Sequence, residues 1–317
     1  MTSPQRLTEA TAFAPASVGN IGVGFDLLGH AIEGPRDIAI VRLIDEPIVR
    51  IDAIRGDVNG VDLLPLEAGR NTAGRALMAF REQHAPDRGF AVELLKGIPL
   101  GRARGGPAPP SAAATAAATA LLDAPLSREA LYSSALDGEA VSSGSRHGDN
   151  VAPMLLGGVA MATATRMIPL LAPATLHAVV VHPDQVLETR RSRAALADPY
   201  PLQTIVEHTT YLAQFLIGLQ RGDLALIEAG LRDVLVEPRR APLIPGFAAV
   251  KAAALDHGAL GASISGGGPS VFAWFASREA AEHAAPAMRD GFVAAGFDAR
   301  AYVTPVNGPR ADLIAQD

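Results

Sequence analysis

Residues 90–122 read FAVELLKGIPLGRARGGPAPPSAAATAAATALL, and they predict a strand, a glycine-rich turn and a helix in direct succession. Residues 90–95 are apolar except for Glu93 and end shortly before a glycine, which is typical of a strand. The alanine-dominated run at 111–122 has a very high helix propensity. A glycine-rich turn that leads into a helix lets backbone N–H groups converge on a phosphate. The unit therefore favours a phosphate site, although most turns of this composition are ordinary connections.

Strands and helices are expected to alternate on both sides of this unit. The patterns typical of strands cover Thr11 to Val18, Asp37 to Arg50, Pro153 to Ala162, His177 to Pro183, Ala259 to Ser265, Val271 to Phe275 and Ala299 to Thr304. The patterns typical of helices cover Asn71 to Gln83, a run capped by Ser127, and residues 202–220, 222–236 and 278–295. This alternation predicts an α+β protein without repeats, and we place a domain boundary near residue 165, between residues 1–165 and 166–317.

The composition disfavours several classes of partner. With 317 residues, 49% of them hydrophobic, the chain is long enough for two packed domains or for one large domain split by a deep cleft. A formal charge of -6 and a pI near 5.8 disfavour nucleic acid. The chain has no cysteine, so a bound metal would use oxygen or imidazole ligands. No segment offers about twenty uninterrupted apolar residues, which predicts a cytoplasmic protein without a membrane partner.

Four polar clusters that contain glycine interrupt the expected strands and helices. They cover residues 20–26, 101–111, 139–150 and 263–270. Asp26, His147 and Asp149 carry groups that suit a hydroxyl or an amino group, and Glu139 could hold Mg²⁺ through oxygen. Taken singly, such residues are more often turn, cap or loop residues. Likewise, Arg193 and Arg240 are either solvated helix charges or bidentate clamps for a carboxylate.

Six stretches, in this order along the chain, resemble motifs of the homoserine kinases in the GHMP kinase superfamily. They are PASVGNIGVGFD at 15–26, Asn71-Thr72, HGDNVAP at 147–153, Thr189 with Arg193, EPRRAPLIPG at 237–246 and GASISGGGPS at 261–270. The resemblance implies a two-domain α+β GHMP kinase that uses ATP to phosphorylate the side-chain hydroxyl of L-homoserine, a step of threonine biosynthesis. A homodimer is a further expectation at the level of the family.

The resemblance also implies a role for each matching residue. Homoserine would be oriented by Asn20, Asp26, His147 and Asp149, and its carboxylate would be bound by Arg193 and Arg240. Mg²⁺ would lie on Glu139, which is therefore a catalytic candidate. The nucleotide would contact Asn71, Pro99, Gly101, Gly105, Gly106, Ser111, Thr189, Gly266, Gly267 and Gly268. Asp149 is the candidate general base, and positioning of the substrate alone is the alternative.

The turn at 101–111 departs from the family pattern. Gly106 and Pro107 stand where the family has two central serines, and the three prolines between 107 and 110 have no N–H group to donate to a phosphate. Arg102 and Arg104 would supply positive charge instead. Residues 102–110 are only Arg, Ala, Gly and Pro, so we hypothesise a local pair of compensating frameshifts. Two alternatives stay open, namely a catalytically impaired homologue that binds ligand or partner, and a GHMP kinase for another small alcohol.

Overall fold

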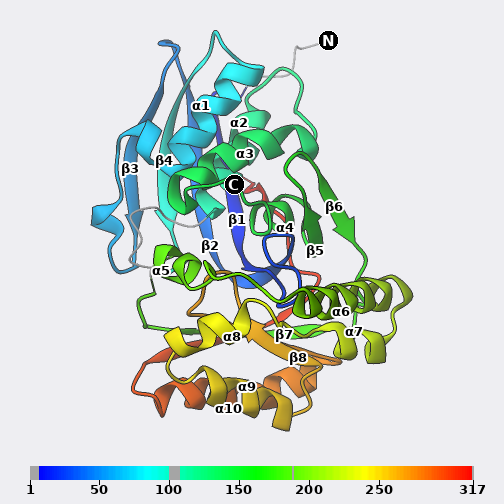
Figure 1. The fold of residues 1–317 in the computed structure, drawn as a ribbon. Helices are drawn as coiled ribbons and strands as arrows, with labels where there is room; N and C mark the ends of the chain where they lie inside the picture. The colour runs from blue at the N-terminus through cyan, green and yellow to red at the C-terminus, as the bar shows by residue number, and fades with distance from the viewer. Residues whose placement is uncertain (1–6, 100–107, 188, 316–317) are drawn as a thin grey trace.

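The computed structural model describes residues 7–99, 108–187 and 189–315, and these form two β-sheets with their helices, one above the other in Figure 1. The first sheet has the strand order β11-β1-β2-β4-β3, and β5 and β6 extend it from β2. Its strands are β1 (Glu9–Gly19), β2 (Leu28–Ile44), β3 (Val49–Gly56), β4 (Gly89–Lys96), β5 (Val159–Ala162), β6 (Met167–Leu170) and β11 (Asp312–Leu313). All neighbours pair antiparallel except β3 and β4.

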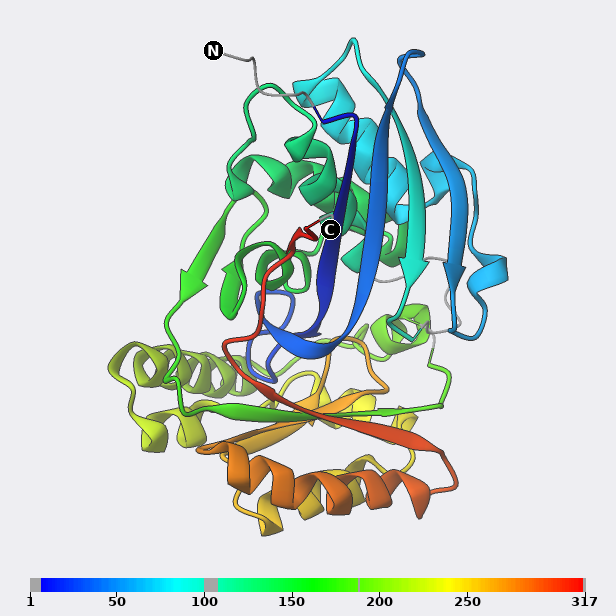
Figure 2. The ribbon, with the colours of Figure 1, turned by 180° about the vertical axis from the view of Figure 1, so that it is seen from behind.

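Helix α2 (Pro109–Ala120) is the buried centre of this upper half. It packs on β1 and β2, and α1 (Thr72–His84) and α3 (Arg128–Ser143) pack against it. Ten of its residues are buried, and eight of those are small residues other than proline. Small side chains let a helix approach a sheet and two neighbouring helices closely, which explains the run of alanines. Figure 2 shows the other face of the sheet, with these helices behind it.

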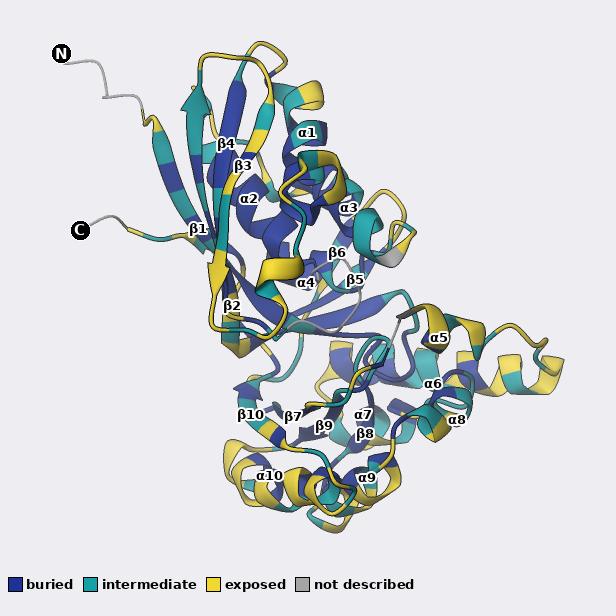
Figure 3. Ribbon diagram, turned by 90° about the vertical axis from the view of Figure 1, so that its left-hand side faces the viewer, coloured by how far each residue is buried: buried dark blue, intermediate teal, exposed yellow. Residues whose placement is uncertain are grey.

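The second sheet has the strand order β10-β7-β9-β8 and is antiparallel throughout. Its strands are β7 (His177–Pro183), β8 (Gly261–Ile264), β9 (Val271–Phe275) and β10 (Ala299–Pro305). Helices α9 (Phe247–Asp256) and α10 (Arg278–Val293) cover one face, and their outer sides are exposed in Figure 3. Every residue of β9 is buried because its other face packs towards the first sheet, which accounts for its uninterrupted apolar sequence.

An apolar cluster joins the two sheets. It combines Val18 and Leu28 of the first sheet with Phe272 and Trp274 of β9 and with Phe215 of α6 (Leu202–Arg221). After β10 the chain returns to the upper sheet, where β11 pairs with β1 (Figure 2). The domain boundary expected near residue 165 stays a proposal, and β6 and β11, which follow it in the sequence, belong to the first sheet. The described residues include no helix with the length and apolar character needed to cross a membrane.

The remaining helices are short. They are α4 (Val151–Leu156), α5 (Thr189–Ala194), α7 (Leu224–Gly230) and α8 (Glu237–Arg240), together with the 3₁₀ turns at Val61–Leu63, Ala68–Arg70 and Ala241–Leu243. Most of the expected elements are confirmed with small shifts of their ends, and Ser127 caps α3 by accepting from Ala130 N. The expected α+β class is confirmed as well.

Three sequence-based expectations were wrong in part. Residues 37–50 were expected to be one strand, but β2 ends at Ile44 and β3 begins at Val49. Residues 153–162 were expected to be one strand, but 151–156 form α4 and only 159–162 form β5. Pro153 lies in the first turn of α4, where a missing N–H group costs little, and Gly157 and Gly158 then turn the chain with φ of 80° and 57°. The helix expected at 222–236 ends at Gly230, because the backbone N–H groups that follow are bound by a side chain described below.

Candidate active site

The turn between β1 and β2 forms one wall of the site. Asn20, Ile21 and Asp26 have φ of 69°, 41° and 55°, a region that residues with a side chain rarely adopt. The amide of Asn20 stabilises the turn, because its Oδ1 accepts from Asp26 N (3.0 Å) and its Nδ2 donates to Gly266 O (2.9 Å). Both polar ends of the buried Asn20 side chain therefore have partners within the protein.

The carboxylate of Asp26 joins three separate segments. Arg193 of α5 donates to both of its oxygens, at 3.1 and 3.0 Å. His147, in the loop between α3 and α4, places Nδ1 3.3 Å from Asp26 Oδ2, and its Nε2 hydrogen bonds with Ser145 Oγ. Burial lowers the pKa of His147, and the charge of Asp26 opposes this shift. The expected substrate residues Asp26, His147 and Arg193 thus lie together.

Two further carboxyl groups lie buried behind Asp26. Burial, assisted by repulsion from Asp26, raises the pKa of Asp149 to about 7. Burial and the charge of Asp149 raise the pKa of Glu139, near the end of α3, to about 8. The charge of Arg193 opposes both shifts. Asp149 lies directly over the backbone of Gly19, where a Cβ atom would be 2.5 Å from its Oδ2. The pair can therefore change protonation near neutral pH.

The glycine turn between β8 and β9 forms the opposite wall. Gly266 and Gly268 have φ of 54° and 80°, so glycine suits these positions. The carbonyl of Gly266 accepts from both Asn20 Nδ2 and Arg240 Nη1, each at 2.9 Å. The carbonyl of Gly267 accepts from Ser192 Oγ at 2.7 Å. These bonds connect the glycine turn to α5, to α8 and to the turn at 20–26.

Arg240 is almost fully buried beside these groups. Besides the bond to Gly266, its Nε donates to Ser192 O at 3.2 Å. Its guanidinium lies 5.3 Å from the centre of the Phe25 ring, and that of Arg193 lies 5.8 Å from the same ring. Burial, followed by the positive charge of Arg193, lowers the pKa of Arg240. An anionic group bound here would be stabilised by both guanidinium groups.

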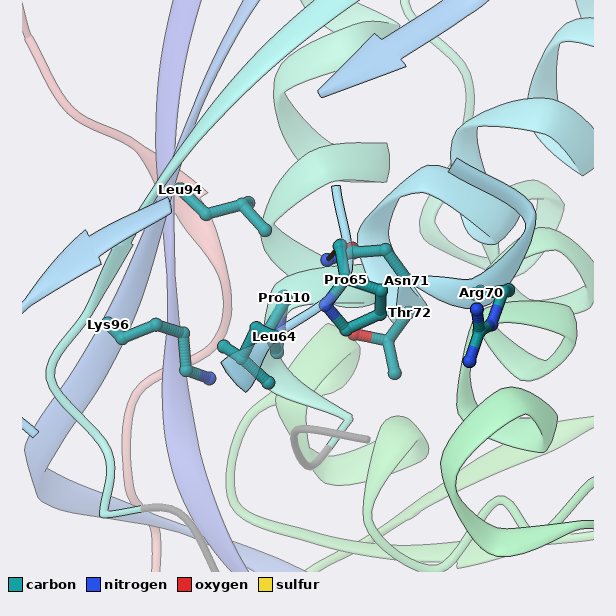
Figure 4. A pocket seen from close by; sticks show the side chains of 8 residues that line it. All are labelled: Leu64, Pro65, Arg70, Asn71, Thr72, Leu94, Lys96 and Pro110. Carbon is teal, nitrogen blue, oxygen red and sulfur yellow. Dashed lines mark hydrogen bonds between the residues drawn. The ribbon is translucent and has the colours of Figure 1, made fainter. Parts of the chain in front are cut away.

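A separate pocket lies between β4 and the start of α1, and Figure 4 shows it with Lys96 and Asn71 on opposite sides. It is lined by Leu64, Pro65, Arg70, Asn71, Thr72, Leu94, Lys96 and Pro110. Asn71 caps α1 by accepting from Ala73 N (3.0 Å) and Gly74 N (3.2 Å), and it donates to Pro65 O (3.0 Å). The expected nucleotide residue Asn71 therefore shapes this pocket from a fixed position.

Lys96 and Asp37 form a buried ion pair at the edge of this pocket. Asp37 Oδ1 also accepts from the backbone N–H groups of Gly97 (2.9 Å) and Ile98 (3.1 Å), so it holds the start of the glycine-rich turn. Burial lowers the pKa of Lys96, and the charge of Asp37 opposes the shift. Sequence reasoning missed both residues, although a lysine directly before Gly97 and an isolated acid in an apolar strand were visible signals.

The pocket and the buried carboxyl groups meet at Gly138. A Cβ atom on Gly138 would lie 2.4 Å from Thr72 O of α1 and 2.7 Å from Ser111 Cβ of α2. The absence of a side chain therefore lets α1, α2 and α3 converge next to Glu139. Ser111 is fully buried there, and its hydroxyl donates to Ala108 O at 2.7 Å.

The other expected nucleotide residues lie at the margins of the described structure. Pro99 follows β4 and is partly exposed, and Thr189 is the first residue of α5, with its side chain outside the description. Gly101, Gly105 and Gly106 lie outside the described residues, and so does most of the segment to which the frameshift hypothesis applies. Sequence reasoning also missed Ser192 and Phe25, which connect the two arginines to the site.

Comparison with protein families finds two matching models. Residues 71–158 match the N-terminal domain of the GHMP kinases, and residues 215–294 match their C-terminal domain. The first match contains Asn71, Ser111, Glu139, His147 and Asp149, and the second contains the glycine turn and Arg240. The buried carboxyl pair and the glycine turn are thus parts of two matched domains.

Individual proteins are similar over nearly the whole chain. The homoserine kinase of Xanthomonas campestris pv. campestris (strain B100) is 57% identical over 309 residues, which cover 98% of this chain and 95% of that protein. The homoserine kinase of Xylella fastidiosa (strain 9a5c) is 56% identical, with 96% of this chain and 94% of that protein covered. The crystal structure of homoserine kinase from Cytophaga hutchinsonii ATCC 33406 superposes with a TM-score of 0.92 at 36% identity. The superposition covers 99% of this chain and 100% of that chain.

Proposed function

Because this chain belongs to the homoserine kinase family of the GHMP kinases, we propose that it transfers the γ-phosphoryl group of ATP to the side-chain hydroxyl of L-homoserine. One observation carries the choice of substrate. The carboxylate of Asp26 and the guanidinium groups of Arg193 and Arg240 lie around one aromatic side chain, Phe25. An α-amino acid presents an ammonium and a carboxylate group, which this arrangement complements. The product, O-phospho-L-homoserine, would place the reaction in threonine biosynthesis.

The proposed reaction depends mainly on positioning and on charge. The hydroxyl oxygen of homoserine forms a bond to the γ-phosphorus, the bond between that phosphorus and the bridging oxygen breaks, and ADP leaves. Asp149 is our candidate for the acceptor of the hydroxyl proton, because its carboxyl group titrates near neutral pH. Asp26 would hold the ammonium group, with His147 next to it. Asn20 would act by fixing Asp26, since both ends of its amide are bonded to the protein.

The residues present also suit a magnesium ion that arrives with ATP. In the part of the chain that the structure describes, no three His, Asp or Glu side chains converge as a complete metal site. Mg²⁺ in kinases commonly takes only one or two protein carboxylates together with phosphate oxygens and water. Glu139 and Asp149 repel each other in a buried setting, so a cation between them would be favourable. Glu139 would hold the ion, which when bound offsets the negative charge of the phosphates.

The nucleotide would lie between the glycine-rich turn and the pocket of Figure 4. Members of the GHMP kinase family use ATP, and Thr72, which lines the pocket, packs against Gly138, the residue before Glu139. Asn71 and Thr72 would face the base. Gly101, Gly105, Gly106, Ser111 and the segment at 266–268 would contribute to the phosphate end. A homodimer and a cytoplasmic location are further expectations of this proposal.

Release of ADP by the purified protein tests the proposal. The assay compares L-homoserine, L-threonine, L-serine and mevalonate in the presence of Mg-ATP. We expect turnover that depends on homoserine, and turnover with mevalonate alone would overturn the proposed substrate. The same assay is then run on a variant in which residues 102–110 are restored to the family pattern. Activity that appears only in this variant would identify the unmodified chain as a kinase silenced at its phosphate loop.

A further inference from the structure

Asp233 lies in the loop between α7 and α8 and accepts hydrogen bonds from three consecutive backbone N–H groups that follow it. Its Oδ1 accepts from the N–H groups of Leu235 (3.0 Å) and Val236 (2.8 Å). Its Oδ2 accepts from the N–H group of Glu237 (2.9 Å). One side chain therefore satisfies the N–H groups at the start of α8, which would otherwise lack partners within the helix.

Val236 connects Asp233 to Arg240 through backbone hydrogen bonds. Its N–H group is held by Asp233, and its carbonyl accepts from the N–H groups of Arg239 (3.1 Å) and Arg240 (3.0 Å). Helix α8 has only four residues, and a helix this short is not stable by itself. The position of Arg240 along the backbone consequently depends on the cap that Asp233 provides.

The side chain of Arg240 needs an accurate position, because it is shared between two parts of the site. It donates to Gly266 O of the glycine turn and to Ser192 O of α5, the helix that also carries Arg193. Arg240 is only 2% exposed, so a displaced guanidinium has no solvent to replace these partners. A small shift of α8 would therefore disturb the glycine turn and α5 together.

We propose that Asp233 is a positioning residue for the substrate site, because it holds the backbone of α8 and thereby places the guanidinium of Arg240. This inference rests on the proposed function and adds to it a residue that acts on the amino-acid end of the substrate through Arg240. Asp233 accepts its three hydrogen bonds from backbone N–H groups, and its charge also acts on the guanidinium of Arg240.

Kinetic constants of three variants test the role. Asp233→Ala removes all three bonds, and we expect the KM for homoserine to rise about tenfold, with a smaller fall in kcat and an unchanged KM for ATP. Asp233→Asn keeps an acceptor oxygen for two of the three donors and should give an intermediate KM. Asp223→Ala is the matched control, because Asp223 caps α7 by accepting from Ala225 N and Leu226 N, and none of its hydrogen bonds within the described residues involves a proposed site residue. It should leave both KM values unchanged.

A double-mutant cycle with Arg240→Ala separates positioning from general stabilisation. If Asp233 acts through Arg240, Asp233→Ala should raise the KM for homoserine little or not at all when Arg240 is already absent. An equal increase in both backgrounds would overturn the inference, and so would an unchanged KM in Asp233→Ala alone.

Hydrogen exchange provides a readout that does not depend on activity. In Asp233→Ala and Asp233→Asn, the amides of residues 235–237, 239 and 240 and of Gly266 should exchange faster than in the wild type, whereas Asp223→Ala should accelerate only those near α7. If the wild type shows no turnover with homoserine, the proposed function fails, but these exchange rates still decide whether Asp233 holds α8 and the glycine turn. Unchanged exchange at residues 239 and 240 and at Gly266 would overturn the inference.

Discussion

At the scale of single residues, Asp149 determines how the proposed reaction depends on pH. Its pKa of about 7, raised mainly by burial, means that the carboxyl group becomes protonated as the pH falls below neutral. A protonated carboxyl group cannot accept the hydroxyl proton of homoserine. We therefore expect kcat/KM to fall about tenfold per pH unit below pH 7, and Asp149→Asn to lower kcat by about 10²- to 10⁴-fold. A pH profile of kcat/KM checks this, and a flat profile from about pH 5.5 to 8 would contradict it.

The second residue-scale prediction concerns the geometry of Arg193. Its guanidinium donates to both oxygens of Asp26, an arrangement that the single ammonium group of lysine does not reproduce. Arg193→Lys should therefore lower kcat/KM for homoserine by about ten- to a hundredfold, mainly through KM. Arg191→Lys is the control, because Arg191 is an exposed residue of the same helix. Effects of equal size would contradict a special role for the bidentate contact between Arg193 and Asp26.

At the scale of elements, the junction of three helices depends on Gly138. A methyl group there would lie 2.4 Å from Thr72 O, and neither this backbone atom nor the buried Ser111 can move aside easily. Gly138→Ala should therefore lower the free energy of unfolding by about 1–3 kcal/mol. It should also weaken ATP binding, since α1 and α2 would separate from Glu139. Chemical unfolding and ATP titration measure the two effects.

Gly69→Ala is the matched control for this substitution. No atom lies within 4 Å of the position that its Cβ would occupy. It should change neither stability nor ATP affinity beyond a few tenths of a kcal/mol. A similar loss of stability in both variants would mean that the convergence at Gly138 is not what limits the packing of these helices.

At the scale of the whole molecule, His30 connects the two sheets. It lies on β2, its Nδ1 donates to Ala31 O (3.1 Å), and its Nε2 accepts from Trp274 Nε1 of β9 (3.3 Å). Complete burial lowers its pKa to about 4, from an ordinary value of 6.5. The unfolded chain therefore binds the proton more readily than the folded one. The stability that neutral His30 provides is complete above pH 6.5 and is lost as the pH falls towards 4.

Comparison of the wild type with His30→Asn tests this contribution. Between about pH 7 and about pH 4.5, His30 should account for a loss of about 2–3 kcal/mol in the free energy of unfolding, which the variant would not show. Trp274 is the single tryptophan of the chain, so its fluorescence reports unfolding at the junction of the sheets. Parallel pH dependence in the two proteins would contradict the assignment.

Local sequence patterns were sufficient to predict most of the helices and strands. Apolar alternation and helix propensity predicted β1, β4, α1, α2 and β7 to within a few residues, because these signals act along the chain. Residues 153–162 were misread, since an apolar run next to a glycine pair suits a strand or a short buried helix equally well. Asp233 was missed because a single aspartate in a loop carries no periodic signal, and only its three backbone partners reveal what it does.

The sequence by itself determined the class of the fold, the order of the motifs and the types of side chain available for chemistry. Only the tertiary structure decided which of them meet. Asp26, Asp149 and Arg193 are far apart along the chain, yet their charges act on one another because β1, α3 and α5 converge at the junction of the two sheets. The raised pKa values of Asp149 and Glu139 have the same origin, since desolvation depends on what surrounds a carboxyl group in space and not on its neighbours in sequence.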